Sequence, residues 1–466
     1  MTRIAIVGGG ITGLAAAHRL YELCPNFSID LLESSSDVGG VLRSERNDQF
    51  LFEHSADMFT TLDKSAIELC ERIGFVDQLI GTNQTNQRAF IAQGNDLVPV
   101  PRGLNLMTPS DLDAIRETDL LSDEGKKRFL EEETIPPKPE PGDESLQAFA
   151  IRRFGQEAYR KIIQPLVGGI YTADPTRLSL KATLPQYLQM ESEHGSVIAA
   201  TRKRVQGFKE KDKSTSGARY NLFMAPKNGM SSLIEALKSR IKSANFLHGR
   251  QVANLVKTGN DWRIEFANGA GHSYDAVILT CPAEGLTRML AKGFGKLSEL
   301  LGQIQYASSA ILVQGYERNQ IGHPLNGFGF VVPLAEKRKI LAGSFSSIKF
   351  AGRCSDDLVL TRTFVGGGCQ PELMNHTDPE LTELASKELG ELLQISGEPR
   401  FEQLVRWDNS MPQYHLGHLD WVKKVEEMLE SEPGLEIAGK SFRGVGIPAC
   451  IRSGETAAEK IATLFS

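Results

Sequence analysis

The sequence predicts an α/β protein in which a parallel-sheet domain is assembled from separated segments, beside a mixed-sheet domain and a helical insert. Three observations predict this. The chain opens with a short branched apolar run, Ile4–Val7, which passes through a glycine-rich turn into a helical run at 14–23; this is typical of a buried parallel strand and its crossover helix. A second strand–turn–helix pattern closes the chain at 435–466. The length, 466 residues, is more than one ordinary hydrophobic core accommodates, so two or three lobes are expected.

The first glycine-rich turn has the spacing of a dinucleotide-binding loop, G-x-G-x-x-G, at Gly8, Gly10 and Gly13. The first glycine permits the tight turn, the second lets the backbone approach a pyrophosphate, and the third lets the helix pack against the strand. The start of the helix offers free N–H groups and partial positive charge. We therefore predict a Rossmann-like dinucleotide site, against the alternative of a glycine-rich turn without a ligand. Its candidate cofactor-binding residues are Gly8, Gly9, Gly10, Ile11, Thr12 and Gly13.

A second apolar run, at 28–33, ends on an acid. Glu33 follows Gly13 by 20 residues and is followed by Ser34; at this spacing a carboxylate can accept hydrogen bonds from a ribose. It would also repel a 2′-phosphate. The signature alone does not separate NAD from FAD. The continuation Val38–Arg43 contains Gly39–Gly40 and Arg43. It resembles the second glycine pair and the arginine that the flavin amine oxidase superfamily places beside FAD. Taken alone, the glycine pair would indicate an ordinary turn and the arginine a solvated charge.

Composition excludes several classes of protein. Hydrophobic content of 41% and charged content of 24% are those of a soluble globular protein. A net charge of −6 argues against nucleic acid as a main partner. No apolar run reaches about 18 residues, so no spanning helix is predicted. The chain enters its first strand at once, so we expect neither a signal nor a transit peptide.

Cysteines and basic residues give weaker indications. The six cysteines are scattered without a C-x-x-C pair, which indicates reduced thiols in a cytoplasmic protein. A basic segment from Arg202 to Lys213 could touch anionic lipid as a peripheral contact or could be a solvated loop. His415 and His418 have the spacing of a metal pair, but Gly417 intervenes and no third ligand is apparent, so we predict no metal site.

The middle of the chain predicts a helical insert followed by a second sheet. A helix is expected at Ser65–Ile73 and a hairpin at 89–100 around Gly94-Asn95. Helical patterns fill most of 105–210. Further elements are predicted as a helix at 229–241, strands at 248–256, 262–266, 276–279, 304–316, 327–333, 340–346 and 357–367, a helix at 381–393, a strand at 435–439 and a helix from about Ser453.

Five further segments carry a more specific likeness: PLVGGIYTADP at 165–175, GFGFVVP at 327–333, SSIKFAGR at 346–353, MPQYHLGH at 411–418 and GVGIPACI at 444–451. Together they resemble the oxygen-dependent protoporphyrinogen/coproporphyrinogen oxidases of haem biosynthesis, from about residue 3 to 462. Two departures are visible. Ser55-Ala56-Asp57 stands where the family usually has Gly-Pro-Asp, and Arg102 is the nearest candidate, in an insecure register, for an arginine that binds a substrate propionate in some members.

The resemblance implies where the cofactor and substrate lie in the chain. Non-covalent FAD would occupy a domain built from 1–85, 225–300 and 400–466. A substrate-binding domain would comprise 86–104 and 301–399, and a mostly helical insert 105–224. Glu33 would hold the adenosine ribose. The other residues implied at FAD are Ser34, Gly40, Arg43, Asp57, Val252, Trp407, Val445, Gly446 and Ile447; without the resemblance, Val252 and Trp407 would read as core residues.

The resemblance also implies the reaction, in which hydride leaves a porphyrinogen meso carbon for flavin N5 and dioxygen reoxidises the flavin, giving hydrogen peroxide. Three rounds would remove six electrons and leave the porphyrin. No nucleophile–base pair is apparent in the sequence, which fits chemistry carried by a cofactor. Val331 and Phe350 would clamp the macrocycle, Gly169 and Gly329 would allow its close approach, and Arg102 could bind a propionate. Hand-over to other haem-pathway enzymes would follow from this role.

Other functions remain open from the sequence. One is another flavin oxidase or desaturase, acting on amines or carotenoids; it would share the pattern of the first 43 residues but should lack the motifs at 165–175 and 346–353. Another is a non-catalytic protein that uses FAD as a structural element for binding a partner. The sequence does not decide between coproporphyrinogen and protoporphyrinogen as substrate, nor does it fix the oligomeric state.

Overall fold

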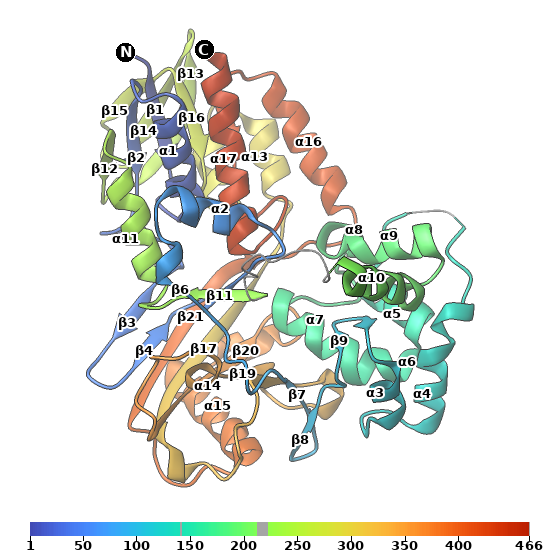
Figure 1. Ribbon diagram of the computed structural model, residues 1–466. Helices are drawn as coiled ribbons and strands as arrows, with labels where there is room; N and C mark the ends of the chain where they lie inside the picture. The colour runs from blue at the N-terminus through green and yellow to red at the C-terminus, as the bar shows by residue number, and fades with distance from the viewer. Residues whose placement is uncertain (140–141, 212–221, 466) are drawn as a thin grey trace. The chain divides into compact units, whose positions relative to one another are not determined.

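The computed structural model describes residues 1–139, 142–211 and 222–465, with the backbone alone at 205–211 (Figure 1). The chain forms two compact units: unit 1 is Met1–Thr82, Tyr220–Gln305 and Leu419–Ser466, and unit 2 is Asn83–Arg219 and Tyr306–His418. The helical segment that we expected as a separate insert therefore falls in unit 2 with the second sheet. Residues 400–418, expected in the FAD-binding domain, also belong to unit 2. The assignment of functions to these parts stays a prediction.

Unit 1 is built on a five-stranded parallel sheet in the order β12-β2-β1-β16-β22. Successive residues of β1 face opposite sides of this sheet, because side chains alternate along a strand. Ile4 and Ile6 pack with helices α1 and α17, whereas Ala5 and Val7 belong to a separate core on the other face. The sheet and its two helices are β1 (Arg3–Val7), α1 (Ile11–Leu23), β2 (Ser28–Leu32), β12 (Ala244–Leu247), β16 (Ala276–Leu279), β22 (Leu435–Ile437) and α17 (Ile447–Leu464).

Smaller elements complete unit 1. A three-stranded antiparallel sheet, β13-β14-β15, contributes to the second core. The predicted strand at 248–256 is wrong at its start, because residues 248–249 form a turn, with Gly249 at φ +64°, and the strand begins only at Val252. The elements are β3 (Ser44–Arg46), β4 (Leu51–Glu53), β5 (Phe59–Thr60), α2 (Ser65–Arg72), β6 (Leu79–Gly81), β11 (Phe223–Pro226), α11 (Met230–Arg240), β13 (Val252–Thr258), β14 (Asp261–Phe266), β15 (Gly271–Tyr274), α12 (Ala283–Leu290), α13 (Gly295–Leu301) and, from its second residue, α16 (His418–Glu430).

Unit 2 contains a seven-stranded mixed sheet in the order β21-β17-β20-β19-β18-β7-β8. Only the β18–β7 pair in this sheet is parallel. Helix α15 (Asp378–Leu393) packs on the sheet through Leu381, Ala385 and Leu389, which share a core with Ala310 and Leu312. The strands are β7 (Phe90–Gln93), β8 (Asp96–Pro99), β17 (Tyr306–Glu317), β18 (Gly329–Val331), β19 (Ala342–Phe345), β20 (Leu358–Gly366) and β21 (Phe401–Pro412).

Helices of the predicted insert form the other part of unit 2. Within the predicted helical stretch at 105–210, residues 180–204 form three separate helices, because Pro185 starts a new helix and Gly195 adopts φ +71°. One π-helical turn, η3 (Tyr159–Ile163), precedes α7 (Gln164–Tyr171). The others are α3 (Leu112–Glu117), α4 (Asp123–Leu130), η2 (Glu131–Thr134), α5 (Leu146–Phe154), α6 (Gln156–Ala158), α8 (Leu180–Thr183), α9 (Pro185–His194) and α10 (Val197–Lys211). The basic segment extends from α10 into 212–213, which lie outside the described residues.

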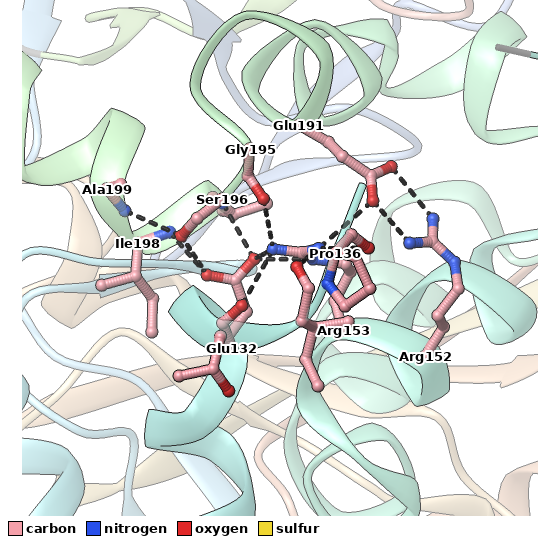
Figure 2. Close-up of polar contacts among 12 residues, drawn as sticks. Glu132, Pro136, Arg152, Arg153, Glu191, Gly195, Ser196, Ile198 and Ala199 are labelled. Carbon is pink, nitrogen blue, oxygen red and sulfur yellow. Dashed lines mark hydrogen bonds and ion pairs between the residues drawn. The ribbon is translucent and has the colours of Figure 1, made fainter. Parts of the chain in front are cut away.

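A buried ion pair joins several of these helices. Glu132 and Arg153 are both fully buried and form a salt bridge, shown in Figure 2. The Glu132 carboxylate also accepts from the backbone N–H groups of Val197 (2.9 Å) and Ile198 (3.0 Å), at the start of α10. Arg153 in turn donates to the carbonyl of Gly195 (3.0 Å). The Glu132 carboxylate therefore pairs with a buried guanidinium and also satisfies backbone N–H groups that have no partner within their own helix.

Among the described residues, no helix is both long enough and apolar enough to cross a membrane.

Candidate active site

The glycine-rich loop of unit 1 is held by contacts that leave no room for side chains. A β-carbon on Gly13 would lie 2.0 Å from the carbonyl oxygen of Gly8, so the helix can approach the strand only with glycine there. Gly8 itself adopts φ +110°, a conformation that favours glycine. These two positions fulfil the structural roles that the motif predicts for its first and third glycines.

Gly10 and Gly446 have open space where a side chain would be. A β-carbon on Gly10 would have no other atom within 4 Å, and one on Gly446 would come within 4 Å only of Pro448 Cδ, at 3.8 Å. Each glycine is the N-cap of a helix, α1 or α17, and neither helix has a side-chain cap. Both helices lie side by side in unit 1 (Figure 1). The geometry fits a dinucleotide pyrophosphate, because free N–H groups at helix ends and room for a close approach are what such a group requires.

Glu33 is buried at the carboxyl end of β2 and is held from several sides. Its carboxylate accepts from the backbone N–H of Gly9 (2.8 Å) and of Ser35 (2.7 Å), and from the hydroxyl of Ser34 (3.2 Å). Burial acts to raise the pKa of Glu33, but the hydrogen bonds from Ser35 and Gly9 outweigh it, so the pKa is lowered. Glu33 is therefore an ionised acceptor fixed directly beside the glycine loop, with lone pairs left for a ribose hydroxyl.

Sequence reasoning missed Thr280, which supports the same loop. Its hydroxyl lies 2.9 Å from the carbonyl oxygen of Gly8 and 3.0 Å from that of Val7, either of which can accept from it. A β-carbon on Gly8 or on Gly13 would meet this same hydroxyl oxygen, at 2.7 and 2.9 Å. The signal was available, because Thr280 directly follows the strand β16 that pairs with β1.

The remaining candidate cofactor residues are distributed over both units. Gly40 (φ +60°) lies close to Gly10, with a β-carbon position 3.3 Å from its Cα. Val252 begins β13, opposite Phe266. Trp407 lies on β21 in unit 2, paired with Ser309. In unit 1, Ile11 and Thr12 are the first residues of α1. Ile447 is the first residue of α17, and Val445 directly precedes Gly446, the N-cap of that helix. The side chain of Arg43 is exposed and that of Asp57 is buried. Their contacts with FAD stay predictions.

Two of the predicted substrate residues meet in unit 2. Gly169 is exposed on α7, and a β-carbon there would lie 3.5 Å from Val331 Cγ1 on β18. Gly329 has a different reason for being glycine. Its φ is +150°, and a β-carbon would lie 2.2 Å from the carbonyl oxygen of Gly343 on β19, so the pairing of β18 with β19 requires glycine at this position.

Phe350 and Arg102 lie in very different surroundings. The ring of Phe350 is fully buried, with Lys349 Nζ and Arg353 Cζ at 5.5 and 5.6 Å from its centroid. Arg102 has a side chain 80% exposed and pairs with Asp111 at 2.8 Å. The full burial of Phe350 is typical of a residue in a packed core. The exposure of Arg102 is typical of a solvated surface charge. The substrate-binding roles of both residues therefore stay predictions.

The comparisons with known proteins bear on this arrangement. Residues 11–462 match the family of flavin containing amine oxidoreductases. The chain belongs to that family. This oxidoreductase is 31% identical to the coproporphyrinogen III oxidase of Bacillus subtilis (strain 168), over 99% of this chain and 98% of that one. It is 30% identical to that of Staphylococcus aureus, over 98% of each chain, and 28% identical to protoporphyrinogen oxidase 2 of Arabidopsis thaliana, over 98% and 93%. The resemblance found in the motifs is confirmed.

Solved structures agree with the fold. A provisionally named protoporphyrinogen oxidase from Exiguobacterium sp. 255-15 superposes with a TM-score of 0.87 at 28% identity, covering 99% of both chains. Reduced UDP-galactopyranose mutase has a TM-score of 0.73 at 17% identity, covering 100% of this chain and 96% of that one, and shows the fold alone. The predicted fold class, a Rossmann-like domain of discontinuous segments with a mixed sheet and helices, is confirmed. As a member of this family, the oxidoreductase uses a flavin.

Proposed function

We propose that this oxidoreductase is an FAD-dependent, oxygen-dependent oxidase that converts coproporphyrinogen III to coproporphyrin III. One observation carries the proposal: similarity over nearly the whole of both chains to proteins named coproporphyrinogen III oxidase, at 31% and 30% identity. Protoporphyrinogen oxidase 2 of Arabidopsis thaliana follows at 28%. The motifs at 165–175 and 346–353, by which we distinguish porphyrinogen oxidases from amine oxidases, are both present.

Unit 1 supplies what non-covalent FAD would need. Open glycines at two helix N-caps, Gly10 and Gly446, support placing a pyrophosphate against the ends of α1 and α17. The fixed carboxylate of Glu33 supports binding of the adenosine ribose and disfavours a 2′-phosphate. FAD fits this pair of features better than FMN, which has a single phosphate and no adenosine.

The chain's own contribution to the reaction is binding and orientation. FAD held by these residues would supply the hydride acceptor for the porphyrinogen, with dioxygen as final oxidant and hydrogen peroxide as by-product. Gly169 and Val331 offer an apolar surface to the macrocycle, and an apolar contact suits a large ring whose carboxylates lie at its rim. Holding the substrate in one orientation lowers the entropy cost of the reaction. Arg102 is the candidate for binding a propionate.

A single set of assays tests the proposal. Purified protein should carry one FAD per chain, released by acid precipitation. Anaerobic coproporphyrinogen III should reduce this flavin, and air should then give fluorescent porphyrin and about three peroxides per porphyrin, without stimulation by NADH or NADPH. We expect kcat/KM to be higher for coproporphyrinogen III than for protoporphyrinogen IX. Flavin reduction by amines but by neither porphyrinogen would refute the proposal.

We also propose that the protein acts in the cytoplasm. All six cysteines are free, as expected where thiols are kept reduced. Peripheral contact with a membrane and hand-over of the porphyrin to a later enzyme remain open. Fractionation and vesicle co-sedimentation would test the membrane contact.

A further inference from the structure

The helix that carries Gly169 is fastened to the sheet of unit 2 at both of its ends. At the start of α7, the side-chain Oε1 of Gln164 accepts from the backbone N–H of Leu334 at 3.0 Å. At its end, Thr172 adopts the left-handed conformation and its carbonyl accepts from the N–H of Gly368 at 2.6 Å. Leu334 begins η5 (Leu334–Glu336), which follows β18 by only two residues. The first contact therefore ties α7 to the segment that carries Val331.

The space between α7 and the sheet is small. Gln164, Gly168, Gly169 and Leu334 all line a cavity of about 10 Å³, which holds roughly one water. A large ring therefore cannot enter between α7 and the sheet. Gly169 lines this space and is also exposed, with its β-carbon position 3.5 Å from Val331 Cγ1, so the two residues meet at the edge of the space. A small change in the spacing of α7 from β18 would alter the surface formed by these two residues directly.

Gln164 also lies at an irregular point of the helix. The π-helical turn at Tyr159–Ile163 ends immediately before it, and such turns occur mostly as isolated features in helices, frequently at functional sites. Its side chain is buried, with 6% exposed. A β-carbon on Gly168 would lie 3.2 Å from Gln164 Nε2, so glycine at 168 leaves the amide in place.

We propose that Gln164 is a positioning residue that sets the spacing between α7 and β18 and so shapes the surface formed by Gly169 and Val331 for the macrocycle. This inference rests on the proposed function. Without the amide oxygen, the N–H of Leu334 loses its acceptor and the end of α7 is free to shift. Misplacement by about 1 Å is enough to cost around a hundredfold in rate when it reaches the reacting atoms.

Two substitutions of Gln164 separate positioning from packing. Gln164→Met keeps the length of the side chain but removes the acceptor, whereas Gln164→Glu keeps an oxygen that can accept. Gln314→Met is the matched control, because Gln314 is fully buried in the same unit and donates to Ser386 (2.8 Å) and Glu402 (2.7 Å). The assays are KM and kcat for coproporphyrinogen III, Kd for the product coproporphyrin III by fluorescence, Tm and flavin content.

Gln164→Met should raise both KM and the Kd for the porphyrin by roughly tenfold to a hundredfold, because a shift of α7 misplaces the surface formed by Gly169 and Val331. In Gln164→Glu, both KM and the Kd for the porphyrin should lie within about twofold of the wild-type values. Gln314→Met should lower Tm without changing KM or Kd. If Gln164→Met does not fold, Gly168→Ala provides the test instead. Its methyl group crowds the side-chain amide of Gln164, so this variant should also raise KM. A folded Gln164→Met protein with the KM and Kd of the wild type would overturn the positioning role of Gln164 but leave the proposed function intact. A wild type that neither oxidises coproporphyrinogen III nor binds the porphyrin would overturn the proposed function as well.

Discussion

Alanine at Gly10 and at Gly13 should have opposite consequences, although both belong to one motif. At Gly10 the backbone has φ −70° and ψ 178°, which alanine adopts freely, and no atom lies within 4 Å of its β-carbon position. Replacing glycine by alanine at a compatible site stabilises a protein by about 0.4–1 kcal/mol, because the unfolded chain loses freedom. Because Gly10 is also the N-cap of α1, where alanine is less favourable than glycine, the two effects offset and the Gly10→Ala apoprotein should stay within about 1 kcal/mol of the wild type.

Gly13→Ala should instead damage the fold. Its β-carbon would lie 2.0 Å from the carbonyl oxygen of Gly8 and 2.9 Å from Thr280 Oγ1, so either α1 or the loop must move. Overpacking of this kind costs about 1–3 kcal/mol, occasionally more. Each kcal/mol lowers Tm by about 2–4 °C in a domain of 150–250 residues, so the apoprotein should melt below the wild type.

Cofactor affinity then shows which glycine faces the ligand. If the pyrophosphate approaches the end of α1, the methyl group of Gly10→Ala occupies that path. Losing one or two charge-assisted hydrogen bonds of about 1.5–3 kcal/mol each weakens FAD binding by at least tenfold. Gly446→Ala, also in open space and at φ −74°, should act in the same way at α17.

The assay is titration of each apoprotein with FAD, followed by flavin fluorescence, beside melting curves without cofactor. Wild-type FAD affinity in both Gly10→Ala and Gly446→Ala would refute our placement of the pyrophosphate. A marked loss of apoprotein stability in Gly10→Ala would show that the loop is packed differently from the structure.

Four further predictions follow from individual side chains. Glu33→Ala should weaken FAD binding by about tenfold to a hundredfold in the same titration; because the folded-state pKa of Glu33 is lowered, its contribution to stability is present above the unfolded-state pKa and is lost as pH falls through the folded-state pKa. Phe350→Ala should cost about 3–5 kcal/mol in denaturant unfolding, since the ring is fully buried; lost kcat/KM with unchanged stability would instead support a substrate contact. Arg102→Ala should leave Tm unchanged, because its pair with Asp111 is exposed, and should raise KM less at high salt than at low salt if Arg102 binds a propionate. Glu132→Leu should lower the unfolding free energy by up to about 3–5 kcal/mol, because buried Arg153 would be left with the longer ion pair to Glu191, at 3.3 Å, and the start of α10 would lose its acceptor; an unfolding free energy equal to the wild type's would contradict this.

Local patterns predicted much of the fold. The loop from Ile4 to Gly13 and the hairpin around Gly94-Asn95 formed as expected, since their geometry depends on neighbouring residues. The long strand β21 was not predicted, because its pairing with β17 joins residues nearly a hundred positions apart and its own pattern is only half-buried. The start of α17 was placed too late, at Ser453 instead of Ile447, since Pro448 was not used as a first-turn signal.

Site residues were predictable where the residue and the backbone it contacts belong to the same short segment of sequence. Glu33 is such a case, because spacing alone puts it beside the glycine loop. Thr280 and Gln164 are not, because each acts on a backbone group far away in the sequence, at Gly8 and at Leu334. Gly329 shows the reverse problem: a glycine within a family motif is required by the neighbouring strand β19, which no local pattern reveals.

The origin of unit 1 in three stretches of chain has a consequence for biosynthesis. Its glycine loop and α1 are synthesised well before β22 and α17, which carry the second open helix end at Gly446, and both stretches of unit 2 lie between them in the chain. Domains fold during synthesis as soon as their parts are available, and here the parts of unit 1 are complete only once α17 has been made. A polypeptide truncated shortly before α17 should therefore fail to retain its cofactor, and cofactor capture in the cell should follow the synthesis of α17.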